Sequence, residues 1–326
     1  MSTNLHTLSR HKRYFPELIG QLAVKKKLSF YLDAFEATKL SPFLCLVGAK
    51  GLGKTEFAKA YAKNLHNDDG NGRAFLELNC STIKNNEQFF EQIFMPIIHD
   101  NEVTILFDEA HALPKDLTMA FLTIFNTEKN HTKNFEWDGM SFEFDFKRQT
   151  FIFATTESDK IFPPLKDRLT TIDFEPYSRD ELAQIVKLCT PNITFTDGAL
   201  EKVAKSVRNN PRNAVMRSKE IVLFCASKNI REFNEESFDE LSDAIGILPY
   251  GISYTERQIL DILKECGSCS LTTLSAKIGL SPSAIRRDHE MYLLNKNLME
   301  IDGKRKITAQ GIKVSDLAQV TLSSEG

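Results

Sequence analysis

The sequence lacks the long apolar runs that membrane-spanning helices need. No apolar stretch approaches the ~18 residues required, and the polar segment from Met1 to Lys12 has no apolar core of the kind found in secretory signals. Cysteine is also scarce, with 6 residues in 326, and four of them lie in apolar stretches where a reduced cysteine packs as a small hydrophobic side chain. We therefore expect a cytoplasmic protein with no membrane segment.

The sequence has no excess of basic charge. It contains 41 Lys and Arg against 44 Asp and Glu, a net charge of −3, so any nucleic-acid binding must be local. Cys266 and Cys269 have the spacing of a metal or redox pair. No second ligand pair stands at a suitable distance, which favours a turn between helices over a zinc site.

A glycine-rich stretch follows an apolar run and precedes a helix-forming segment. Residues 48–55 read GAKGLGKT and match the pattern GxxxxGK[ST]. Glycines let the backbone wrap a polyphosphate, so that N–H groups and the helix N-terminus point at the anion. Lys54 is expected to reach the β- and γ-phosphates of a nucleoside triphosphate, and Thr55 to hold Mg²⁺. The glycines of the predicted binding site are Gly48, Gly51 and Gly53.

A second phosphate-site element lies about fifty residues further on. Residues 103–109, VTILFDE, read as a buried strand that ends in two acidic residues. A solvated strand end is the simpler interpretation, but the spacing behind a P-loop argues against it. We expect Asp108 to support Mg²⁺ and Glu109 to orient or deprotonate the attacking water. His111 is expected to have a structural role.

Aromatic residues alternate from Phe135 to Phe146 around Asp138-Gly139, which predicts a β-hairpin. The intervening side chains include Glu136 and Glu143, so an exposed tip would repel phosphates and suit a protein partner. The alternative is a hairpin that packs on its own core, and the pattern does not decide between them.

From residue 178 the pattern changes to short helices, over 179–188, 197–207, 211–226 and 235–245, with Ser178 and either Thr196 or Asp197 as caps. Arg208 and Arg217 are expected to be solvated. The chain breaks again near residue 248, where three helices and the turn signal Asp302-Gly303 predict a winged helix-turn-helix. Its region 276–313 holds eight basic and four acidic residues. The expected phosphate contacts are Arg286 and Arg287 of the third helix and Lys304, Arg305 and Lys306 of the wing.

The order of these segments resembles the AAA+ ATPases and, within them, the RuvB family, over residues 13 to about 313. The resemblance implies an α/β fold: a P-loop ATPase domain with a parallel sheet, an all-α lid and a C-terminal winged helix-turn-helix. The expected boundaries are a flexible tail over 1–12, the ATPase domain over 13–177, the lid over 178–247, the winged helix over 248–318 and a second tail over 319–326.

The resemblance also implies roles for single residues. In the segment PPLKDRL, residues 163–169, Arg168 matches the arginine finger that a subunit presents to its neighbour's ATP. The strand 151–156, FIFATT, places a threonine at the sensor 1 position, with Thr155 preferred over Thr156. The remaining positions are Arg212 in NNPRNA, which matches sensor 2, and Tyr14 and Ile19, which are candidate contacts of the adenine base.

For function, the resemblance implies an ATP-hydrolysing, Mg²⁺-dependent homo-oligomer. This oligomer is expected to form a hexameric ring and to move duplex or junction DNA as in branch migration. Two alternatives remain open. One is a loader of a helicase or clamp, or an origin initiator, that uses ATP as a switch. The other is a protein remodeller whose winged helix binds a protein partner.

Overall fold

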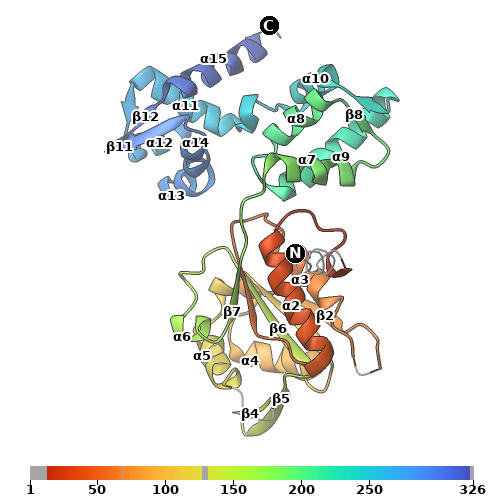
Figure 1. The fold of residues 1–326 in the computed structure, drawn as a ribbon. Coiled ribbons are helices and arrows are strands. Elements are labelled where there is room, and N and C mark those ends of the chain that lie inside the picture. Colours follow the sequence, from red (N-terminus) through yellow and green to blue (C-terminus); the bar gives the residue numbers. More distant parts are fainter. Residues whose placement is uncertain (1–12, 68, 127–130, 324–326) are drawn as a thin grey trace, which may run out of the picture. The chain divides into compact units, whose positions relative to one another are not determined.

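The computed structural model describes residues 13–67, 69–126 and 131–323 (Figure 1). The chain divides into two compact units, Met1–Tyr177 and Ser178–Gly326. The tail expected over residues 1–12 and the last residues of the other, 324–326, lie outside the described residues. Residues 319–323, also expected in that tail, instead continue the last helix, α15 (Ala309–Ser323). No helix in the described part of the chain is both long and apolar enough to cross a bilayer.

A parallel sheet forms the centre of the first unit, with strands in the order β2-β3-β6-β1-β7. Its buried strands read as near-continuous apolar runs, as expected where helices cover both faces. Because all five strands are parallel, their carboxyl ends meet at one edge of the sheet. The strands are β1 (Leu44–Val47), β2 (Ala74–Asn79), β3 (Val103–Asp108), β6 (Gln149–Thr155) and β7 (Thr170–Asp173).

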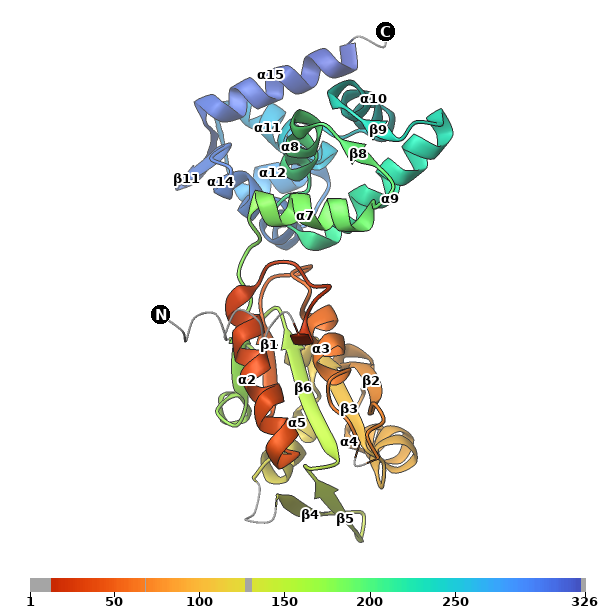
Figure 2. The ribbon, with the colours of Figure 1, turned by 45° about the vertical axis from the view of Figure 1, so that its right-hand side comes forward.

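Helices cover both faces of this sheet, with α2 and α5 on opposite sides (Figures 1 and 2). The face towards α5 is built from phenylalanines: Phe121 packs edge-on against Phe107 of β3, with ring centroids 5.2 Å apart. The helical elements are α2 (Leu22–Thr38), α3 (Lys54–Ala62), η1 (Cys80–Thr82), α4 (Asn86–Phe89), the π-helix η2 (Phe90–Ile98), η3 (Ala110–Ala112), α5 (Lys115–Ile124) and α6 (Pro163–Lys166).

The predicted hairpin forms, with β4 (Thr132–Trp137) antiparallel to β5 (Met140–Asp145). Its aromatic face packs on the core of the same unit: Phe144 stacks on Phe94 at 4.5 Å between ring centroids, and Phe142 is buried. Of the two alternatives, the structure thus favours packing on the hairpin's own core for the aromatic side chains. The opposite face is exposed and carries Asn134, Glu136, Ser141 and Glu143.

The second unit begins with four helices, as predicted. Ser178 forms a capping box with Glu181, and Thr196 caps the next helix by accepting a hydrogen bond from the Ala199 N–H at 3.4 Å, which settles the choice between Thr196 and Asp197. A pair of two-residue strands was not predicted. The elements are α7 (Arg179–Cys189), β8 (Thr194–Phe195), α8 (Asp197–Ser206), α9 (Pro211–Lys228), β9 (Glu232–Phe233) and α10 (Glu235–Ile245).

A winged helix follows in the same unit, around a core that includes Ile259, Leu274 and Leu293. Its third helix is continuous but varies in pitch, with a π-helical stretch between two α-helical ones. Cys269 is buried in a short strand, and the described residues contain no metal-binding cluster. The elements are η4 (Pro249–Gly251), α11 (Tyr254–Cys266), β10 (Ser268–Cys269), α12 (Leu271–Ile278), α13 (Pro282–Ala284), η5 (Ile285–Glu290), α14 (Met291–Asn295), β11 (Met299–Asp302) and β12 (Lys304–Ile307).

Candidate nucleotide site and nucleic-acid surface

The glycine-rich loop joins the end of β1 to the first turn of α3. Gly51 and Gly53 have φ angles of 84° and 89°, which a side chain would strain. Gly48 needs its missing side chain for a different reason, because a Cβ there would lie 2.8 Å from the Cβ of Phe174. The loop is also held to the sheet, since the Gly48 N–H donates to the carbonyl of Thr155 at 3.3 Å. These features give a tightly fixed loop at a helix N-terminus, a geometry suited to phosphate.

Lys54 is buried and folds back over this loop. Its Nζ donates to the carbonyl oxygens of Gly48 at 2.7 Å and Ala49 at 3.1 Å. The ammonium is therefore held where a phosphate chain wrapped by the loop would pass. Thr55, the next residue, is half-buried in the first turn of α3.

Asp108 and Glu109 stand at the carboxyl end of β3, two strands from β1 in the sheet. Burial raises the pKa of Asp108, a shift that the Glu109 N–H, donating to Asp108 Oδ1 at 3.0 Å, and the charge of Lys54 oppose. A half-buried carboxylate whose charged form is favoured by a nearby cation, together with the Thr55 hydroxyl, forms an oxygen donor set that fits Mg²⁺. Mg²⁺ takes few protein ligands and completes its coordination shell with phosphate and water. Glu109 itself adopts a left-handed backbone, with φ of 54°.

His111 connects the ends of β3 and β6. Its Nδ1 lies 3.0 Å from the Thr155 hydroxyl, and its Nε2 lies 3.2 Å from Glu157 Oε2. The Thr155 hydroxyl also accepts a hydrogen bond from the Glu157 N–H at 3.0 Å, and Thr155 is fully buried. The hydroxyl of Thr156, by contrast, lies 3.4 Å from Glu109 Oε2 on a less buried residue. Of the two threonines, the geometry favours Thr156 for contact with a nucleotide.

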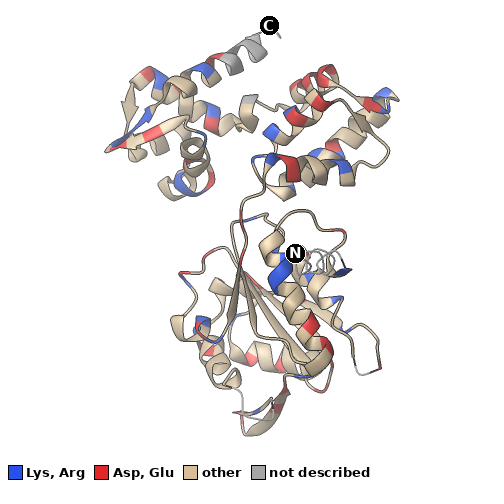
Figure 3. Ribbon diagram, viewed as in Figure 1, with Lys and Arg blue, Asp and Glu red and all other residues tan. Residues whose placement is uncertain are grey.

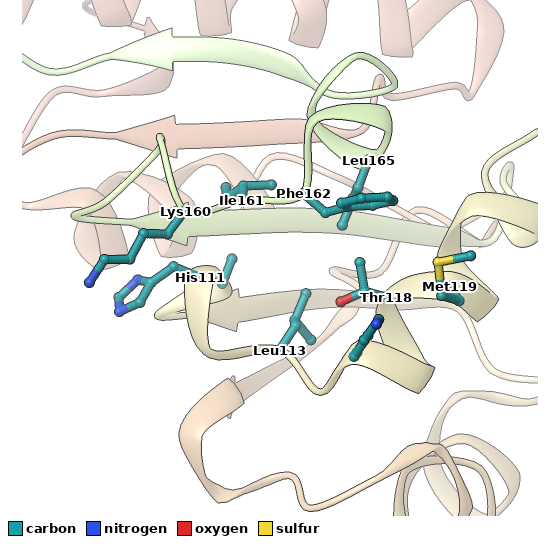
Figure 4. Close-up of a pocket in the computed structure, with 10 residues that line it drawn as sticks. His111, Leu113, Thr118, Met119, Lys160, Ile161, Phe162 and Leu165 are labelled. Atoms are coloured by element: carbon teal, nitrogen blue, oxygen red, sulfur yellow. The ribbon is translucent and has the colours of Figure 1, made fainter.

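A pocket of about 240 Å³ lies on the other side of His111, between η3 with α5 and the segment that leads into α6 (Figure 4). His111 and Lys160 lie together at one end, and Met119 and Phe162 are among its apolar side chains. No residue of the glycine-rich loop lines it, so it is separate from the candidate nucleotide site. His111 contributes to both, which the sequence did not indicate.

The predicted base contacts lie in the segment before α2. Tyr14 is buried, and its hydroxyl lies 2.8 Å from Asp33 Oδ1 and 3.0 Å from Glu36 Oε1. Burial and these two carboxylates raise the pKa of the Tyr14 phenol. Ile19 is half-buried. Sequence reasoning missed Tyr177, whose hydroxyl lies 3.5 Å from the Leu52 carbonyl oxygen of the glycine-rich loop.

The two predicted arginines of the ATPase cycle are exposed. Arg168 follows α6, and its Nη1 donates to the Pro164 carbonyl at 2.6 Å. It makes no ion pair with a carboxylate in the described part of the chain. Arg212 stands in the first turn of α9 in the second unit, where its N–H donates to the side chain of the capping residue Asn210 at 2.9 Å.

Arg208 and Arg217 are not solvated, contrary to expectation. Arg217 is half-buried and pairs with Glu220 at 2.6 Å on the same helix. Arg208 is half-buried too, and its guanidinium pairs with Glu256, which is completely buried. In both cases the paired carboxylate compensates the charge of the guanidinium, which therefore does not have to be surrounded by water.

The winged helix corrects one predicted phosphate contact. Arg305 is buried, and its Nε donates to Glu290 Oε1 at 2.6 Å, so it ties the wing to η5 and cannot face a phosphate. Basic and acidic residues both occur along this domain (Figure 3). Arg287 pairs with Asp288 at 2.8 Å and Lys306 with Asp302 at 3.2 Å. Exposed positions are Arg286, Arg287 and Lys304, while Lys306 is partly exposed.

Comparison with known proteins agrees with this architecture. Residues 44–177 match the AAA family, the ATPase family associated with various cellular activities, and residues 249–315 match the RuvB C-terminal winged helix domain. The "Holliday junction branch migration complex subunit RuvB" of Thermotoga maritima is 25% identical over 304 residues, covering 90% of this chain and 88% of the relative. Its counterpart in Phytoplasma mali is 28% identical over 293 residues, covering 87% and 85%.

Solved structures give the same result for the fold. The structure titled "Thermotoga maritima RuvB Holliday junction branch migration motor" superposes with a TM-score of 0.74 at 23% identity, over 92% of this chain and 95% of that one. The AAA match supports ATP binding and hydrolysis at the glycine-rich loop, and the second match supports the winged helix. On the agreement of site, domain order and relatives, we identify this chain as a RuvB-like AAA+ ATPase with a RuvB C-terminal winged-helix domain.

Proposed function

We propose that the protein is a RuvB-type DNA motor, a homo-oligomer that hydrolyses ATP to move duplex DNA in the branch migration of recombination junctions. The observation that carries the proposal is the presence, in one chain, of an AAA site and a RuvB winged helix, with relatives named as branch-migration subunits along about nine-tenths of the sequence. In this proposal the ATP site lies between subunits, and because head-to-tail interfaces form rings where the rotation closes, we further propose a closed, hexameric ring.

The proposed roles in hydrolysis follow the site geometry. Lys54 contacts the β- and γ-phosphates, and Thr55 and Asp108 hold Mg²⁺, which neutralises phosphate charge when bound. Glu109 orients or deprotonates the attacking water at the carboxyl edge of the sheet. Thr156 replaces Thr155 as the proposed γ-phosphate sensor, because the Thr155 hydroxyl is already bonded to His111 and Glu157.

Arg168 acts in a neighbouring subunit's site in this proposal. Its exposure and its lack of a carboxylate partner among the described residues leave the guanidinium available to stabilise charge on the transferred phosphoryl group. Such a finger accounts for about 10³ to 10⁵ in rate. Arg212 contacts the γ-phosphate from the lid. Arg286, Arg287, Lys304 and Lys306 contact DNA phosphates.

The test is ATP turnover without nucleic acid, with linear duplex and with a four-way junction, for the wild type and Arg168→Ala. We expect stimulation by DNA, strongest with the junction, and a loss of at least about 10³-fold in Arg168→Ala. Lys84→Ala, which removes an exposed cation from the same unit, serves as the control and should behave as wild type.

Mixing separates a finger in trans from a residue that acts in its own site. Arg168→Ala and Glu109→Gln subunits are each expected to be inactive alone, and mixed oligomers should recover part of the turnover, because some interfaces then pair an intact site with an intact finger. Failure to recover would place Arg168 in its own subunit's site. ATP turnover that DNA does not stimulate would instead favour a loader or a protein remodeller. The exposed acidic face of β4 and β5 would then be the first candidate for the surface that contacts the partner.

A further inference from the structure

The lid and the winged helix meet at the carboxyl end of α8. A Cβ on Gly251 would lie 2.3 Å from the carbonyl oxygen of Ser206, so the two backbones touch there and only glycine fits. Close by, the hydroxyl of Tyr292 in α14 donates to the carbonyl of Tyr250. The two parts are therefore joined by a backbone contact and by the half-buried side chain of Tyr292.

Arg208 extends from this end of the lid into the winged helix. Its guanidinium lies over the ring of Tyr292, with Cζ 3.9 Å from the ring centroid, and pairs with Oε1 of Glu256 on α11. Glu256 is completely buried, and its second oxygen accepts a hydrogen bond from the Ser253 N–H at 2.7 Å as part of a capping box. A third group, His289 of η5, lies 3.4 Å from the same Oε1.

The backbone of Arg208 leads directly into the sensor 2 segment. Arg208 and Asn209 both have left-handed backbones, with φ of 59° and 55°, a conformation that non-glycine residues rarely hold without support from their surroundings. Asn210 then caps α9, and Arg212 stands in the first turn. The position of Arg212 is thus set by a short strained segment whose only long side chain is anchored in the winged helix.

We propose that Arg208 is a positioning residue that couples Arg212 to the winged helix, so that the nucleotide state and DNA binding influence one another through the Arg208–Glu256 pair. The inference rests on the proposed function, in which Arg212 contacts the γ-phosphate and the winged helix contacts DNA. Coupling of this kind is reciprocal: the factor by which ATP changes DNA affinity equals the factor by which DNA changes ATP affinity.

The test compares the dissociation constant for duplex DNA with and without a non-hydrolysable ATP analogue, in full-length protein. Arg208→Gln combined with Glu256→Gln removes both charges at once, which avoids leaving a buried carboxylate unpaired. Arg208→Lys keeps the charge but loses the planar group over Tyr292. The matched control is Arg217→Ala, which removes a half-buried arginine of the same lid whose ion pair lies within α9.

We expect the wild type and Arg217→Ala to show the same ratio of the two constants, Arg208→Lys an intermediate ratio and the double variant a ratio near one. A merely structural role would lower melting temperature without changing the ratio. A wild-type ratio in either Arg208 variant that binds DNA overturns the inference and leaves the proposed function standing. A wild type that does not bind DNA at all overturns both.

Discussion

Arg305 and Lys304 are neighbours in the wing, and the structure gives them opposite roles. The Arg305 side chain is 11% exposed and that of Glu290 is 6% exposed, with 2.6 Å between Nε and Oε1. Removing one partner of such a pair leaves a buried charge uncompensated and lowers the free energy of unfolding by about 3–5 kcal/mol. In a unit of this size we expect Arg305→Ala to lower the melting temperature by roughly 6–20 °C.

Lys304→Ala should weaken DNA binding and leave the stability nearly unchanged. Lys304 is exposed, so its loss leaves the melting temperature nearly unchanged. If Lys304 neutralises a DNA phosphate, the affinity falls for every sequence and the slope of log K against log salt becomes shallower by about 0.9. Thermal unfolding and DNA-binding titrations at three or more salt concentrations measure both quantities.

The variant that separates a structural role of Arg305 from a role in DNA binding combines Arg305→Met with Glu290→Leu. Replacing both members of a buried pair with apolar side chains of similar volume is often neutral or stabilising, so the double variant should recover the melting temperature lost in Arg305→Ala. We expect it to bind DNA with wild-type affinity and salt slope. A folded double variant whose slope is shallower by about one phosphate contact would refute the assignment of Arg305 as a purely internal cation.

Three further outcomes test the nucleotide site. Glu109→Gln should retain ATP binding but lose about 10² to 10⁴ in turnover, measured by nucleotide titration and phosphate release, and wild-type turnover would remove Glu109 from its proposed role. Thr156→Val should slow turnover with little change in melting, whereas Thr155→Val should lower the free energy of unfolding by about 1–3 kcal/mol because it leaves its bonded partners unsatisfied; the opposite pattern would return the sensor role to Thr155. Gly48→Ala places a Cβ 2.8 Å from that of Phe174 and should destabilise by about 1–3 kcal/mol, so an unchanged melting temperature would contradict the close contact.

The glycine-rich loop and the strand ends could be predicted because each depends on residues close in sequence. The order of glycines before Lys54 fixes a loop at a helix N-terminus, and an apolar run that ends at Asp108 fixes a strand end. A parallel sheet then brings these ends together without further information. The hairpin was predictable for the same reason, but its packing was not, since Phe144 meets Phe94 only in the folded unit.

Charged residues with distant partners could not be placed in this way. Arg208 meets Glu256 across 48 residues of sequence, and no local pattern distinguishes it from a solvated arginine at a helix end. Arg305 is a different case. It stands between Lys304 and Lys306 on a strand, and alternation along strands sends its side chain to the face opposite theirs, towards Glu290. The period-two pattern therefore indicated that Arg305 faces away from its two neighbours, although the run of three basic residues suggested a single surface.

These internal pairs change what the winged helix can offer to DNA. Of its four acidic residues in 276–313, three pair with Arg287, Arg305 and Lys306, and the pairs of Arg287 and Lys306 lie at the surface. Arg286 and Lys304 remain as exposed predicted contacts without a carboxylate partner in the described part of the chain. Since the affinity of a protein for DNA rises with the number of phosphates that it neutralises, one such surface binds weakly. Firm engagement of duplex DNA then requires several winged helices on one DNA molecule. Because linked sites gain affinity without any new contact, the oligomer that we propose to complete the ATP site would also meet this need of the DNA surface.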